Sequence, residues 1–127
     1  PAVRDVEAEL VTALRILPAI RAAGVDIVDV EKHLPYAAVS TLPSQEAERT
    51  WGGPFGSVSD VIDVDIDVFA AGLEQVFDAA QAVRRWLLAD APGLGFQPTS
   101  VPVFTARPDF NERVRRRGAV VRFRARH

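Results

Sequence analysis

The sequence predicts an α/β fold of the α+β class, in which two main helices pack on one mixed, largely antiparallel sheet of four to five strands. Three observations lead to this class. The chain has 127 residues, a length that suits a single domain over 1–127. Two segments space their apolar residues as amphipathic helices do, and two others alternate apolar and charged residues with a period of two. The expected order is α-β-β-β-α-β-β.

The first helix is expected to run from Val3 to about Ala23. Its buried stripe is predicted to consist of Val6, Leu10, Ala13, Leu14 and Leu17. Because Pro18 lacks a backbone N–H, the helix should kink there or restart as a short turn, and Gly24 supplies a stop. Strands are then expected at Val25–Val30 and Tyr36–Leu42, which are rich in β-branched residues.

Residues 43–57 lack either pattern and are expected to form a long loop. The loop carries Trp51 and Phe55, which either fold back onto the core or dock on a neighbouring chain. Its glycines do not form a phosphate-binding loop, because no Gly-Lys-Ser/Thr ending follows them. Trp51 and Phe55 are therefore candidate interface residues.

The third strand is expected from Val58 to Phe69, with apolar residues on one face and Asp63, Asp65 and Asp67 on the other. A helix from about Ala71 to Ala89 follows. Its predicted buried stripe is Leu73, Val76, Phe77, Ala80, Val83 and Leu87. Val101–Phe104 is expected to be only an edge or interrupted strand, since Pro102 cannot donate a ladder hydrogen bond. The last strand, within 114–125, again alternates.

The net charge of −2 hides two opposed parts. Residues 107–127 hold eight arginines and two acidic residues, a net charge of +6, whereas residues 1–106 carry a net charge of −8. The overall acidity argues against a dedicated nucleic-acid binder. We predict instead that Asp63, Asp65 and Asp67 pair across strands with Arg122, Arg124 and Arg126. If they stayed unpaired, they would form an acidic face able to repel phosphate.

Several classes of site are excluded or disfavoured. The absence of cysteine excludes disulfides, thiolate metal sites and cysteine nucleophiles. Asp63, Asp65, Asp67 and Glu74 match ligand positions of an EF-hand loop, but β-branched Val68 occupies the position that requires glycine, so no metal site is expected. With only two histidines, His33 and His127, no catalytic triad can be assembled, and we expect neither an enzyme nor a cofactor. No apolar run is long enough to span a membrane, so no membrane partner is expected.

The cluster of Arg113, Arg115, Arg116 and Arg117 has two interpretations. A nucleic-acid site would normally interleave aromatic residues and lie in a basic context, and both are missing here. A solvated turn or a salt-bridge patch between subunits requires neither, and we favour it. These arginines join Trp51 and Phe55 as candidate residues for contacts with a neighbouring subunit or another partner.

Taken together, the first helix, the long loop, the acidic strand Asp63–Phe69 running into a helix with Val83–Leu87, and Arg115–Arg117 leading into an Arg-rich strand resemble a known family. The chain resembles, over nearly its whole length, the small lambda-type tail terminator proteins of long-tailed bacteriophages. The resemblance rests on layout, without an invariant motif. Related neck or head–tail joining proteins, and an Arg-rich nucleic-acid-binding module, are the alternatives.

This resemblance implies a structural virion protein assembled in the host cytoplasm. Family members form a ring, typically hexameric, that caps the completed tail tube, stops its polymerisation and joins the tail to the head connector. The implied partners are further copies of the chain, the tail tube protein and the neck proteins. DNA would pass through the ring without specific binding, and no cofactor is implied.

Overall fold

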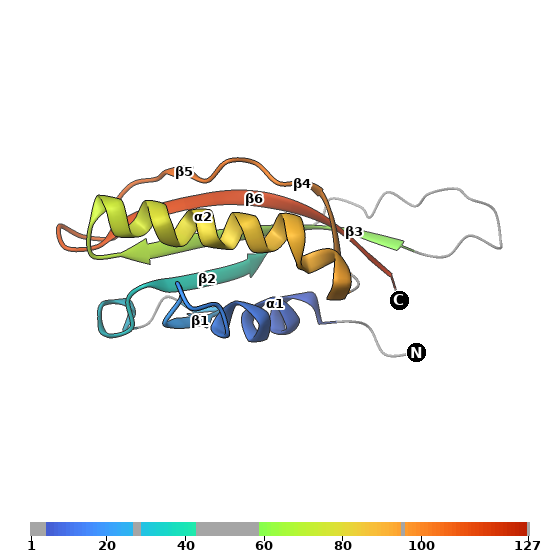
Figure 1. Ribbon diagram of the computed structural model, residues 1–127, viewed down its shortest axis with the longest axis horizontal. Helices are drawn as coiled ribbons and strands as arrows, with labels where there is room; N and C mark the ends of the chain where they lie inside the picture. Colours follow the sequence, from blue (N-terminus) through green and yellow to red (C-terminus); the bar gives the residue numbers. More distant parts are fainter. Residues whose placement is uncertain (1–4, 27–28, 43–58, 95, 127) are drawn as a thin grey trace.

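Helices lie in front of a twisted sheet in this computed structural model, which describes residues 5–26, 29–42, 59–94 and 96–126 (Figure 1). The elements in chain order are α1 (Val6–Arg15), β1 (Ala22–Gly24), the 3₁₀ turn η1 (Val30–Lys32), β2 (Tyr36–Thr41), β3 (Ser59–Ala70), α2 (Leu73–Ala89), the 3₁₀ turn η3 (Ala91–Leu94), β4 (Phe96–Ser100), β5 (Thr105–Ala106) and β6 (Arg115–Arg126).

The sheet has the spatial order β1-β2-β3-β6-β4, with β5 also paired to β6. The pairing of β1 with β2 is parallel, and every other pairing is antiparallel. At its centre, β3 and β6 pair without a break from Ser59 opposite Arg126 to Ala70 opposite Arg115. The predicted class is confirmed, with six strands in place of four to five.

Both helices cover the same face of the sheet. Helix α1 contacts β1 and β2, while α2 lies over β3 and β6 (Figure 1). Between the layers lies the main core, in which the largest fully buried side chains are Phe123, Leu10, Leu14, Ile66, Leu87, Val39, Val64, Val68 and Val76. The alternation predicted for the acidic strand is confirmed, because Val64, Ile66 and Val68 face this core. The opposite face of the sheet carries no α-helix in the described part of the chain, and we call it the open face.

Helix α1 is shorter than the sequence predicts. The Asp5 side chain accepts a hydrogen bond from the Ala8 N–H and caps the start of the helix. The helix ends at Arg15 because Pro18 cannot supply an N–H and its ring would clash with the carbonyl of Leu14. The chain then turns into β1, so the prediction of helix up to Ala23 was wrong.

The strand predicted at Val25–Val30 was also misplaced. The strand here is β1, which ends at Gly24. Within the predicted range, Asp29 has the left-handed φ of 56°, and Val30 opens the 3₁₀ turn η1. Val30 is almost fully buried, so its apolar character reflects packing from a turn. Burial and strand geometry favour the same β-branched residues, and this explains the error.

The chain around Pro102 forms an interrupted edge. Residues 101–104 are not in a strand, but β4 before them and β5 after them both pair with β6. The expectation of an interrupted strand holds, although its paired residues lie on either side of the predicted segment. Pro98 and Pro102 remove donors from this edge, and this limits the addition of further strands.

A smaller apolar cluster lies on the open face, at the end of the sheet where β6 begins. It consists of Val30, Tyr36, Ala38, Phe69 and Val114. The Phe69 ring makes edge contacts with the rings of Tyr36 and Phe110, at centroid distances of 6.4 and 5.9 Å. The Tyr36 hydroxyl donates to the Asp26 carbonyl. Burial, and then the negative charge of Asp26, raise the pKa of Tyr36. No described helix is long and apolar enough to cross a membrane.

We predict that Ile66→Ala lowers the free energy of unfolding by about 2–5 kcal/mol, because it leaves a cavity in the main core. Val120→Ala is the control, since Val120 is 41% exposed on the neighbouring strand β6 and should change stability by no more than about 0.5 kcal/mol. Urea denaturation followed by circular dichroism measures both. Equal losses in the two variants would contradict the placement of the core.

Candidate functional site

A network of charged side chains crosses the open face from β3 to β6. In the strand register Asp63 lies opposite Arg122, Asp65 opposite Val120 and Asp67 opposite Gly118. We call the network the charged face; it comprises Asp63, Asp65, Asp67, Arg107, Arg116 and Arg122. It is the main concentration of paired charge in the described residues, and it brings the acidic and basic parts of the sequence together.

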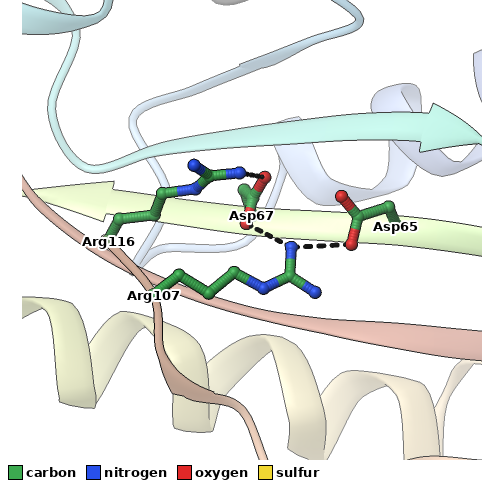
Figure 2. Close-up of polar contacts among 4 residues, drawn as sticks. All are labelled: Asp65, Asp67, Arg107 and Arg116. Carbon is green, nitrogen blue, oxygen red and sulfur yellow. Dashed lines mark hydrogen bonds and ion pairs between the residues drawn. The ribbon is translucent and has the colours of Figure 1, made fainter. Parts of the chain in front are cut away.

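Asp67 is the centre of this network and is only 7% exposed. Its Oδ1 accepts a hydrogen bond from Arg107 Nη1 at 2.7 Å, and its Oδ2 accepts one from Arg116 Nη2 at 2.6 Å (Figure 2). Burying a carboxylate without such partners would be strongly unfavourable. The two guanidinium groups compensate for the removal of Asp67 from water.

Arg107 reaches Asp67 by crossing over Gly118. The Arg107 N–H donates to the Arg116 carbonyl at 3.1 Å, which fixes the segment directly after β5 against β6. A methyl group at position 118 would lie 2.7 Å from Nε and Cζ of Arg107, and closer still to Asp67 Oδ1. Glycine is therefore required at this point by the close approach of the two side chains.

The same Arg107 Nη1 lies 2.7 Å from Asp65 Oδ1, so one cation bridges two aspartates (Figure 2). Burial by itself lowers the pKa of Arg107, but hydrogen bonds and charge attraction with Asp65 and Asp67 outweigh it and raise the pKa. Arg107 therefore remains a cation, and it relieves the repulsion between two carboxylates spaced two residues apart on one strand.

At the far end of the charged face, Arg122 forms an ion pair with Asp63. Arg122 Nε donates to Asp63 Oδ1 at 2.9 Å, and Nη2 donates to Oδ2 at 3.3 Å. This hydrogen bonding lowers the pKa of Asp63, with partial burial opposing and the charge of Arg122 assisting. The cross-strand pairing predicted from the sequence is confirmed for Arg122. It was wrong for Arg124, which lies opposite Val61, while the register places Arg126 opposite Ser59.

The predicted basic cluster is divided between the two faces of the sheet, because successive residues of a strand point to opposite sides. Arg115 pairs with Asp109 at 2.6 Å, while Arg116 pairs with Asp67. The Arg117 guanidinium lies 5.3 Å from the centre of the Phe77 ring on α2 and donates to the Phe104 carbonyl. Arg113 precedes the strand and is exposed.

These contacts overturn the interpretation of Asp63, Asp65 and Asp67 as an acidic face that repels phosphate. Each of the three carboxylates has a guanidinium within 2.9 Å. The sequence pattern missed Arg107, which carries two of these pairs. It stands alone before Pro108 in a segment with no alternation, and the only available signal was its nearness to the Arg-rich strand.

Other features of the chain are weaker candidates for a functional site. The four residues of the EF-hand match do not form a loop, since Asp63, Asp65 and Asp67 lie within continuous strand β3. No group of metal-binding side chains is present in the described ranges. A shallow groove lies between the turn at Pro18 and the start of α2, with Glu74 and Asp78 on its wall. Trp51 and Phe55 fall outside the described residues.

Comparison with models of protein families and with curated proteins gives no match to this chain.

We predict that Arg107→Ala lowers the free energy of unfolding by about 1.5–3 kcal/mol, because Asp67 loses one of its two cations. Gly118→Ala should cost about 1–3 kcal/mol through overpacking. The double variant should lose less than the sum, by about 0.5 kcal/mol or more, since much of the clash is with Arg107.

Urea denaturation of the four proteins measures this cycle, and Arg124→Ala serves as the control because Arg124 is an exposed arginine of the same face. The control should stay within about 0.5 kcal/mol of the parent. Strict additivity of Arg107→Ala and Gly118→Ala would show that Gly118 does not make room for Arg107.

We predict that Arg122→Gln raises the pKa of Asp63, because it removes the main cause of the lowering. A lowered carboxyl pKa stabilises the folded state above the unfolded pKa of about 4, and the stabilisation is lost as pH falls through the folded value. The parent should therefore be more stable than the variant at neutral pH, and this difference should shrink in acid. NMR titration of the Asp63 carboxyl and urea denaturation at several pH values test this. An unchanged titration of Asp63 would contradict it.

Proposed function

We propose that this chain is a structural virion protein of a long-tailed bacteriophage, which forms a ring on the completed tail tube. In this role it stops polymerisation of the tube and joins the tail to the head connector. Its partners would be further copies of the chain, the tail tube protein and the neck proteins. Its location would be the virion, after assembly in the host cytoplasm.

The observation that carries the proposal is how the arginines are used. Among the arginines of 107–126 whose side chains the structure describes, five have contacts within the chain, namely Arg107, Arg115, Arg116, Arg117 and Arg122. A nucleic-acid-binding module would direct such side chains outward to phosphate. Here they hold the sheet together, which suits a scaffold that is built into a larger assembly.

The layout of the fold supports the same role. The amphipathic helix α1, the acidic strand β3 leading into α2, and the Arg-rich strand β6 form one two-layer unit, as the resemblance to tail terminators implies. The turn that carries Arg113 lies at one end of the sheet, where β6 begins (Figure 1). Strand ends of a subunit are suited to contacts along the tube axis, and sheet edges to contacts around the ring.

We predict that the purified protein added to polymerising tail tubes of the same phage produces tubes with a ring at one end and halts their growth. Arg113→Glu should weaken capping without changing the unfolding midpoint, because Arg113 is exposed at the end of the sheet. Arg124→Glu, a charge reversal of the same kind at an exposed site on β6, is the control.

Negative-stain electron microscopy and tube-length distributions measure capping. Tubes that grow equally long with and without the protein would refute the proposal. Retention on DNA that falls steeply between low and high salt would instead favour the Arg-rich nucleic-acid-binding alternative. The tail terminator should show little retention at any salt concentration.

A further inference from the structure

One flank of α2 presents exposed apolar side chains beside the interrupted edge of the sheet. Leu73 is 69% exposed and Phe77 is 45% exposed, and they lie one helical turn apart. Val103, in the segment between β4 and β5, is 61% exposed. Arg117 connects the two parts, since its guanidinium stacks on Phe77 and bonds the Phe104 carbonyl. We call Leu73, Phe77, Val103 and the neighbouring Arg84 and Arg117 the α2 flank.

Two arginines of this flank lack carboxylate partners within the described residues. Arg84 Nη2 has only the Val101 carbonyl, at 3.4 Å, and Arg84 Nε is buried without a hydrogen-bond partner. Arg117 has only the Phe104 carbonyl and the Phe77 ring. The segment 96–106 beside them contains no charged residue. Half-buried guanidinium groups usually pair with carboxylates, so this flank suits an apolar partner that carries acidic groups.

The opposite edge of the same sheet has that character. It is formed by α1 and β1 (Figure 1). Ile16 is 79% exposed and Val25 is 49% exposed there. Residues 5–29 hold five acidic and two basic side chains; Asp5 and Glu7 bond within the chain, whereas Asp26 and Asp29 are exposed. We call the exposed residues Ile16, Val25 and Asp26 the α1 edge.

We propose that copies of this chain associate head to tail, with the α2 flank of one copy docked on the α1 edge of the next. Phe77 lies toward the β5 side of the sheet through its contact with Arg117, and the α1 edge lies at the opposite edge of the sheet, beside β1. The two surfaces differ in charge, so each copy offers one of each. Contacts of this kind are heterologous and generate a closed ring when the rotation between copies closes. The inference deepens the proposed function, on which it rests only for the expectation of ring closure.

We expect side chains to form the contact between copies, and we do not expect the sheets of neighbouring copies to pair by backbone hydrogen bonds. Strand β1 has only three residues, and at the other edge Pro98 and Pro102 lack the backbone N–H that a pairing strand would need. The contact therefore depends on Phe77 and Leu73 as apolar anchors and on Arg84 and Arg117 for orientation.

We predict that the parent sediments as an oligomer and that Leu73→Ser with Phe77→Ser weakens its self-association by about tenfold or more, as expected when central anchors are removed. Val120→Ser is the matched control, because Val120 is similarly exposed on the other face of the sheet. Sedimentation velocity over a range of concentrations measures association, and circular dichroism checks the fold. A parent that stays monomeric at high concentration would overturn the inference, as would equal effects of both variants.

Cross-linking tests the direction of the contact. Because the chain has no cysteine, Val103→Cys and Val25→Cys can be prepared separately and mixed with a short bis-maleimide. We expect cross-linked pairs that contain one chain of each variant. Pairs formed only between two Val103→Cys chains would indicate a symmetric dimer and overturn the head-to-tail contact.

The two proposals fail separately in these experiments. Cross-linked rings that do not cap tail tubes would refute the phage function and leave the contact standing. Capped tubes without the mixed cross-link would support the phage function and overturn the head-to-tail contact.

Discussion

A carboxylate buried on the open face of the central strands requires cations within reach, and much of that face is arranged around the requirement. Asp67 takes one guanidinium from Arg116 on the neighbouring strand and one from Arg107 after β5. The second pair fits only because Gly118 has no side chain. By holding Arg107, the pair fixes the segment that leads to Phe110, whose ring packs on Phe69. The electrostatic pairs and the apolar cluster of the open face therefore support one another.

The opposed charges of the sequence are largely balanced within the chain. The acidic strand β3 and the Arg-rich strand β6 are neighbours at the centre of the sheet. Among the described residues, the groups that remain for partners include exposed Arg113, and Arg84 and Arg117, for which the described part of the chain supplies no carboxylate. Specific assembly depends more on such unmatched groups than on total charge, because groups already paired have little to gain from a partner.

Periodic segments could be predicted from the sequence, and contacts made by irregular segments could not. The alternation in β3 and β6 identified both strands, their buried faces and the Asp63–Arg122 pair. Prediction failed at Val25–Val30, where apolar residues pack from a turn, and at Arg107, whose role depends on the gap at Gly118. Neither is encoded by a local period. The split of Arg115–Arg117 between two faces follows from strand geometry, once the start of β6 is known.

The central ladder of the sheet also constrains how the chain reaches its fold. Its paired residues are between 45 and 67 positions apart in sequence, so β3 cannot pair with β6 until β6 has been synthesised. Long-range pairing of this kind is slow, and an unpaired β-branched strand is prone to aggregate meanwhile. The aspartates that alternate along β3 oppose this, because charges on a waiting strand repel other copies. Before they pair with the arginines of the folded chain, these carboxylates would therefore limit aggregation of the chain during its synthesis.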